Sequence, residues 1–155
     1  MEKKIPPPLV AIICGLLMKW IAGVDFLENN LVSDAFELIK LLIVLCLILT
    51  GLFIDVLAIF SFRKGKTTIN PLNPNATSKL VINGVYKISR NPMYLGLVLF
   101  LCAWGLYLSS VFSFLIVPVF IFYITRFQII PEEQVLEEIF SDEFLNYKQT
   151  VRRWI

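Results

Sequence analysis

Long runs of apolar residues alternate with short polar stretches along this chain. The first run extends from Leu9 to Phe26 and is interrupted by Lys19, and the second extends from Leu38 to Phe62. As helices that rise 1.5 Å per residue, such runs cover most or all of a bilayer core about 30 Å thick. The pattern therefore predicts two membrane-spanning helices within residues 9–62.

A polar connection over residues 63–92 separates these runs from the rest of the chain. Its passage TTINPLNP contains Pro71 and Pro74 and cannot continue a helix. Two more apolar runs follow, Met93–Ser109 and Val111–Ile130, with only Ser109 and Ser110 as a turn between them. Residues 93–130 are therefore predicted to form a tight helical hairpin.

The last segment, residues 131–155, is amphipathic at helical spacing. It predicts a helix that lies flat at the membrane interface. The fold class is thus an all-α polytopic membrane protein with about four spans and a C-terminal interfacial helix. The apolar face of that helix is Val135, Leu136, Ile139 and Phe140, and the acidic face is Glu132, Glu133, Glu137 and Glu138.

Composition supports a membrane protein of one domain, residues 1–155. Hydrophobic residues make up 57% of the chain, and the mean hydropathy is +0.76. The net charge of +2 is too small to indicate a nucleic-acid partner. Residues 25–37 are acidic, whereas the two termini and the connection over residues 63–92 carry most of the Lys and Arg. This asymmetry predicts that both termini lie on the cytoplasmic side of the inner or cytoplasmic membrane.

The chain contains no histidine, which excludes a Ser-His-Asp triad and a histidine zinc site. Its three cysteines show no paired metal-ligand spacing, so no metal is expected. Chemistry must then use carboxylates, Arg, Tyr, backbone dipoles or a bound cofactor.

Asp55 and Arg126 are charged residues inside the predicted spans. Asp55 lies seven residues before Phe62, or about 10 Å inside the boundary of a helix. Intramembrane charges usually face a cavity or a partner. Asp55 is accordingly a candidate for the site, the alternative being a hydrated ion pair with Arg63 or another loop cation. Arg126 is likewise either a substrate contact or a side chain that reaches the lipid headgroups.

A helix should start at Pro92, because Asn91 is a favourable N-cap and proline suits the first helical position. Unpaired N–H groups at that end favour an anionic group.

The string G-x-Y-x-x-x-R-N-P-M-Y-x-G over residues 84–96 and the block that starts at Pro131-Glu132-Glu133 carry a resemblance. Together they resemble the isoprenylcysteine carboxyl methyltransferase and phospholipid methyltransferase superfamily of integral membrane enzymes, over roughly residue 70 to the C-terminus. In the tail block, Phe144 stands where the family pattern has Tyr.

The resemblance implies S-adenosylmethionine as the cofactor and a lipophilic or lipid acceptor that approaches from the bilayer. It maps cofactor contacts onto the backbone around residues 78–81, onto Tyr86, onto residues 91–94 and onto Glu132. Arg90 could hold the carboxylate of the cofactor. The predicted cofactor-binding residues are Leu80, Val81, Tyr86, Arg90, Asn91, Pro92, Met93, Tyr94, Gly96 and Glu132.

The predicted substrate residues are Arg126 and Gln128, since Gln128 stands where the prenylcysteine enzymes carry an Arg. Methyl transfer to a carboxylate needs no base, whereas an amine or hydroxyl acceptor needs one. The candidate catalytic residues are Glu133 and Asp55 as the base, with Arg126. The sequence leaves open a prenylcysteine-like carboxylate or a phospholipid amine.

Two other functions remain open at this point. Membrane sterol reductases resemble the superfamily in their C-terminal half, so an NADPH-dependent reductase is one alternative. The other is a non-enzymatic four-span transporter or partner protein, for which Asp55 is the candidate charged residue.

Overall fold

A computed structural model of the chain describes residues 5–24, 34–65 and 80–155, and within them it contains helices and no strand. The predicted all-α fold is confirmed. The α-helices are α1 (Pro7–Gly23), α2 (Asp34–Gly65), α3 (Pro92–Tyr107), α4 (Ile116–Ile124) and α5 (Ile130–Thr150).

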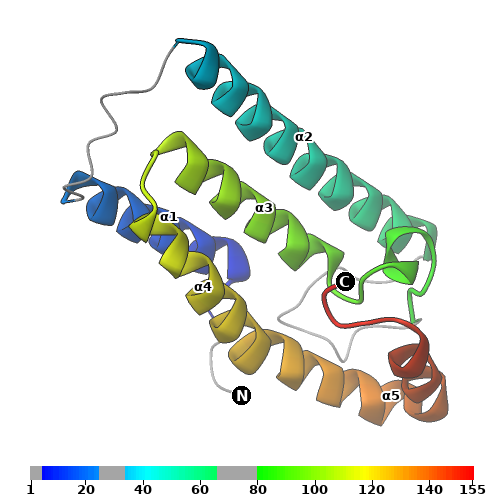
Figure 1. Cartoon of the computed structure of the whole chain (residues 1–155). Coiled ribbons are helices and arrows are strands. Elements are labelled where there is room, and N and C mark those ends of the chain that lie inside the picture. The colour runs from blue at the N-terminus through cyan, green and yellow to red at the C-terminus, as the bar shows by residue number, and fades with distance from the viewer. Residues whose placement is uncertain (1–4, 25–33, 66–79) are drawn as a thin grey trace.

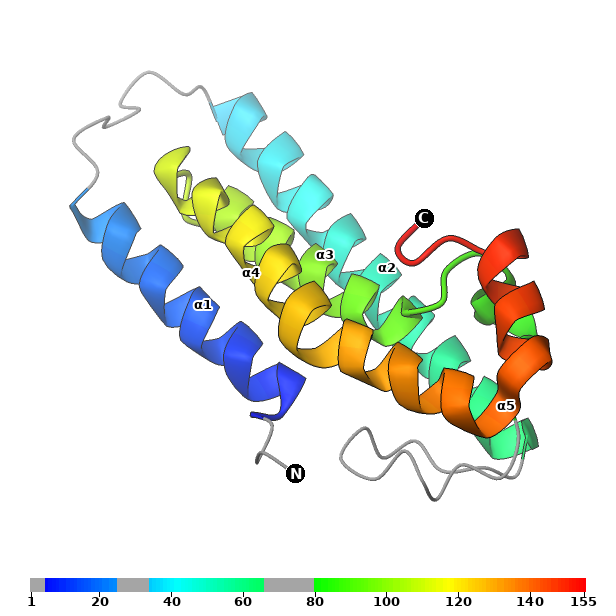
Figure 2. The same cartoon turned by 90° about the horizontal axis from the view of Figure 1, so that it is seen from below.

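Helix α3 lies at the centre of the bundle, with α2 on one side and with α1 and α4 on the other (Figures 1 and 2). Buried residues of α1, α3 and α4 form one apolar core, including Met18, Leu101 and Phe120. Two hydrogen bonds tie α1 to this core: Trp104 Nε1 donates to the Gly15 carbonyl at 3.0 Å, and Ser113 Oγ donates to the Met18 carbonyl at 2.8 Å.

Two glycines let α2 and α3 approach closely. A Cβ on Gly51 of α2 would lie 2.8 Å from the Phe100 ring and 3.2 Å from the Gly96 carbonyl oxygen of α3. Real side chains do not tolerate such contacts without displacement, so this crossing requires glycine. The same crossing holds Asp55 against α3.

The predicted hairpin is present, with its turn at Ser109 in the left-handed region (φ 53°). After the turn, a short 3₁₀ helix, η3 (Phe112–Leu115), leads into α4. Lys40 Nζ of α2 donates to Ser109 Oγ at 2.8 Å, which fixes the turn against α2.

The predicted junction between hairpin and tail is not a break. Helix α4 continues through a π-helical turn, η4 (Thr125–Ile129), directly into α5. Pro131 has no N–H to donate to the preceding turn, and a π turn is one way in which a helix absorbs such a loss. Figure 1 shows α4 and the first part of α5 as one long rod.

The predicted single interfacial helix over residues 131–155 is wrong in two respects. The backbone kinks at Ser141 (φ 42°, ψ −116°), and the helix ends at Thr150. Beyond the kink the chain turns back, so that Phe144 and Tyr147 pack against Leu80. Ile139, on the predicted apolar face, is 40% exposed in the protein, and its placement at a membrane interface stays a prediction. Periodicity alone assigned one face to a segment that bends.

Within the residues that the structure describes, two helical stretches are long and apolar enough to cross a membrane, Phe36–Arg63 and Phe112–Thr150. Helices α1 and α3 are apolar but shorter, with 17 and 16 residues. A count of four spans stays a prediction. The predicted polar connection begins only after Gly65 and contains a 3₁₀ helix, η2 (Gly84–Lys87), while residues 66–79 lie outside the described residues.

Candidate active site

The first turn of α3 and the first turn of α5 meet through their side chains. Tyr94 Oη donates a hydrogen bond to Glu132, with its oxygen 2.8 Å from Oε1 and 3.0 Å from Oε2. Gln128 Nε2 donates to Glu132 Oε1 at 2.9 Å. A carboxylate 38 residues distant in sequence is thus fixed beside Tyr94 by two neutral donors.

The π-helical turn contributes to this arrangement. Gln128 and Glu132 are four residues apart and share a helix face. Gln128 is 3% exposed and points inward, whereas its neighbours Arg126 and Phe127 are exposed. π-helical turns occur frequently at functional sites.

Asp55 of α2 is held at the same end of the bundle. A Cβ on Gly96 would lie 2.8 Å from Asp55 Cγ, so the carboxylate lies directly against the α3 backbone. Asp55 Oδ1 is buried and has no hydrogen-bond partner among residues 5–24, 34–65 and 80–155. The alternative of an ion pair with Arg63 does not appear among the described residues. An unpaired buried carboxylate oxygen is costly, which marks it as a functional candidate.

Tyr86 of η2 lies within electrostatic range of the carboxylates of Asp55 and Glu132. Its ring is buried and meets Phe62 edge to face at 5.4 Å, and its carbonyl accepts a hydrogen bond of 2.6 Å from Tyr147 Oη. Burial raises the pKa of Tyr86 above its ordinary value, and Tyr147, Asp55 and Glu132 raise that pKa further. The phenol therefore stays neutral and feels the charge of both carboxylates.

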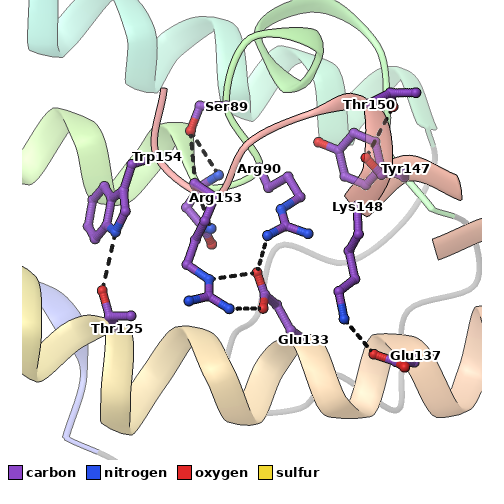
Figure 3. Close-up of polar contacts among 11 residues, drawn as sticks. Ser89, Arg90, Thr125, Glu133, Glu137, Tyr147, Lys148, Thr150, Arg153 and Trp154 are labelled. Atoms are coloured by element: carbon purple, nitrogen blue, oxygen red, sulfur yellow. Dashed lines mark hydrogen bonds and ion pairs between the residues drawn. The ribbon is translucent and has the colours of Figure 1, made fainter. Parts of the chain in front are cut away.

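Glu133, next to Glu132, faces a different set of partners (Figure 3). Its Oε1 lies 3.0 Å from Arg90 Nη2 and 3.1 Å from Arg153 Nε, and its Oε2 lies 2.7 Å from Arg153 Nη2. Both oxygens are thus bonded by guanidinium groups. This geometry favours a structural role for Glu133 over the predicted role as base.

The C-terminal tail closes over the start of α3. The Arg90 N–H donates to the Arg152 carbonyl at 3.1 Å, and Asn91 Nδ2 donates to the Arg153 carbonyl at 3.0 Å. Trp154 Nε1 donates to Thr125 Oγ1 at 3.2 Å. The tail thereby joins the start of α3 to η4.

Helix α3 begins at Pro92, as predicted, but Asn91 does not cap it through its side chain. The Asn91 amide group is bonded to the tail, and the Asn91 N–H donates to Ser89 Oγ at 3.1 Å. The N–H groups of Tyr94 and Leu95 both donate to the Asn91 carbonyl. Fewer free N–H groups therefore remain at this end than the sequence predicts.

The remaining predicted residues lie in several environments. Arg126 is exposed, and Leu80 packs in the small apolar cluster with Phe144 and Tyr147. Val81 and Met93 are half-buried. Ser78 lies outside the described residues.

Sequence reasoning missed three residues that shape the site: Arg153, Tyr147 and Gly51. Arg153 and Tyr147 act from the far end of the chain, and only a folded tail shows which carboxylate or carbonyl they meet. Gly51 carried a signal, since it lies four residues before Asp55 on the same helix face.

Comparison with known proteins agrees with this picture. Residues 39–143 match the family model described as phospholipid methyltransferase. This match includes α2, the hairpin and the first arm of α5, and therefore Asp55, Tyr94 and Glu132. The chain belongs to this family of membrane methyltransferases.

One relative, described only as an uncharacterized protein of Haemophilus influenzae, is 51% identical over 63 residues, which are 41% of this chain and all of that one. No solved structure matches the chain.

Proposed function

We propose that the protein transfers a methyl group from S-adenosylmethionine to a lipophilic or lipid acceptor at the cytoplasmic face of the membrane. The observation that carries the proposal is the contact of Tyr94 and Gln128 with Glu132. This contact joins the two segments that resemble the cofactor-binding blocks of the family.

The residues fit the charges of the proposed donor. S-adenosylmethionine carries a sulfonium, an ammonium and a carboxylate, and when bound it supplies an electrophilic methyl group. The carboxylates of Glu132 and Asp55 suit the positive groups, while the faces of Tyr86 and Tyr94 suit a sulfonium or an adenine ring. Arg90 suits the carboxylate.

The acceptor remains either a carboxylate or an amine. Bond formation at the methyl carbon displaces a neutral thioether, and the chain lowers the barrier mainly by holding the reacting atoms in line. An amine acceptor must also lose a proton. We propose Asp55 as the base, because its Oδ1 has no hydrogen-bond partner in the described part of the chain, whereas both oxygens of Glu133 are bonded to Arg90 or Arg153.

The same proposal places four spans across the bilayer, with both termini on the cytoplasmic side. The spans are α1, α2, α3 and the rod formed by α4, η4 and the first part of α5. η2, the kinked part of α5 and the tail then share the cytoplasmic end, where a soluble donor arrives. A lipid acceptor arrives from the side of the spans.

Equilibrium binding tests the donor assignment. Calorimetry on purified protein in detergent should detect S-adenosylmethionine binding that weakens at least tenfold in Glu132→Gln and Tyr94→Phe, because each change removes part of the charged hydrogen-bond group. The matched control is Glu138→Gln, which changes an exposed carboxylate of α5. Unchanged affinity in the first two variants would refute the site.

A further inference from the structure

Arg90, Glu133 and Arg153 form a cluster with an excess of positive charge. Two guanidinium groups share one carboxylate, so the three side chains carry a formal charge of +1. The side chains of Arg90 and Glu133 are each only 10% exposed, and that of Arg153 is 35% exposed. A mostly buried excess charge of this kind favours an anionic partner.

Arg90 also has unpaired N–H donors among the described residues. Its Nη2 bonds to Glu133, whereas its Nε and Nη1 are buried and have no hydrogen-bond partner among the described residues. A guanidinium has five N–H groups, and buried N–H groups in proteins nearly always meet an acceptor. The unpaired nitrogens belong to a side chain that is nine-tenths buried.

We infer that Arg90 forms a buried anion-binding site beside the Tyr94–Glu132 contact, and that Glu133 positions its guanidinium for a carboxylate or a phosphate. This inference rests on the proposed function, because the anion belongs to the methyl donor or to the acceptor. It makes Glu133 a positioning residue that acts through Arg90.

The tail explains how Arg90 is held. Arg153 pairs side-on with Glu133 and so keeps both carboxylate oxygens in place, while the Arg152 carbonyl accepts the backbone N–H of Arg90. Arg90 is thus fixed at its backbone and at one of its nitrogens, and its other nitrogens stay available. Such fixing reduces the entropy lost when a ligand binds.

Two ligands offer the required chemistry. The amino-acid carboxylate of S-adenosylmethionine and the phosphate of a phospholipid acceptor are both anionic, and each can accept charged hydrogen bonds from the unpaired nitrogens of Arg90. Both would approach the cytoplasmic end of the bundle.

Calorimetry with three probes separates these sources: S-adenosylmethionine, its decarboxylated analogue and glycerophosphoethanolamine. The variants are Arg90→Gln, Arg90→Lys and Glu133→Gln, and the matched control is Glu137→Gln, which breaks the neighbouring pair with Lys148.

If Arg90 holds the donor carboxylate, Arg90→Gln and Glu133→Gln weaken S-adenosylmethionine binding at least tenfold and leave binding of the decarboxylated analogue unchanged. Arg90→Lys should then restore part of the loss. If Arg90 holds the phosphate, only glycerophosphoethanolamine binding weakens.

A purely structural role would weaken all three probes to the same degree, and no role would leave all three unchanged. Either result overturns the inference. Failure of the proposed function looks different, because the wild-type protein itself would then not bind S-adenosylmethionine.

Discussion

Tyr94 is fixed at both ends. Its ring packs in the core with Val98 and Leu101 of its own helix, and its hydroxyl reaches both oxygens of Glu132. A side chain held in this way keeps Glu132 in one orientation before any ligand arrives, which is the preorganisation that positional catalysis requires.

The close contact of Gly96 with Asp55 leads to a prediction for a single substitution. Gly96→Ala should lower the free energy of unfolding by about 1–3 kcal/mol, because the new methyl group would contact the Asp55 carboxylate 2.8 Å from its Cγ. Thermal unfolding in detergent measures the loss.

The matched control is Gly15→Ala in α1, where the nearest atom to a new Cβ is 3.9 Å away. Adding Asp55→Ala should remove most of the penalty of Gly96→Ala. If Gly96→Ala lowers the stability by the same amount with and without Asp55→Ala, the two residues do not touch.

The sequence predicted that Tyr94 and Glu132 meet, but it did not predict the contacts that the C-terminal tail makes. Tyr94 and Glu132 come from two short blocks, and the structure brings them into contact. Asn91 was predicted as a side-chain cap, yet its amide bonds the Arg153 carbonyl, because the tail competes for the same donor.

At the scale of elements, apolar runs located α1, α2 and the hairpin, since span length follows from bilayer thickness. The kink at Ser141 carries no comparable signal. A non-glycine residue at φ 42° and ψ −116° is strained, and it is held there by packing of Phe144 and Tyr147 on Leu80.

Ser141→Gly should therefore stabilise the protein by about 1 kcal/mol, because glycine adopts this conformation without a Cβ penalty. In a regular helix, a change to glycine lowers the stability by up to about 1 kcal/mol. A kinked α5 and an unkinked α5 therefore predict stability changes of opposite sign. Chemical unfolding measures the sign, with Ser141→Ala as the control that keeps the strain. A loss of stability in Ser141→Gly would argue against the kink.

At the scale of the whole molecule, the kink in α5 brings the C-terminal part of the chain back against the candidate site. Tyr147 donates to the Tyr86 carbonyl, Arg153 pairs with Glu133, and Trp154 donates to Thr125. These contacts bring η2, η4, α5 and the C-terminal tail together at one end of the bundle. Figure 2 shows the C-terminal end beside the start of α3. Contacts at such sequence separations are not readable from periodicity.

The burial of Tyr86 predicts that the protein loses stability at alkaline pH. Burial, with Tyr147 and the two carboxylates after it, raises the pKa of Tyr86 above its usual 10.0 in the folded chain. The stability contributed by the neutral phenol is then fully present below about pH 10 and is lost as the pH rises further, because the unfolded chain ionises first.

The measurement is the unfolding midpoint between pH 8 and pH 11. Tyr86→Phe should flatten its alkaline decline, whereas Tyr107→Phe, at a position 54% exposed, should leave it as in the wild type. A decline that is the same in both variants would contradict burial of the Tyr86 phenol.

Transfer of a labelled methyl group tests the central claim most directly. Purified protein in vesicles of cytoplasmic-membrane lipid would receive S-adenosylmethionine labelled on its methyl group, and the lipid fraction would then be extracted and counted. We predict label in a lipid product with the wild type and the Glu138→Gln control, and a loss of at least tenfold with Glu132→Gln. Label that enters lipid equally with Glu132→Gln, or no label with wild-type protein that binds the donor, would contradict the account.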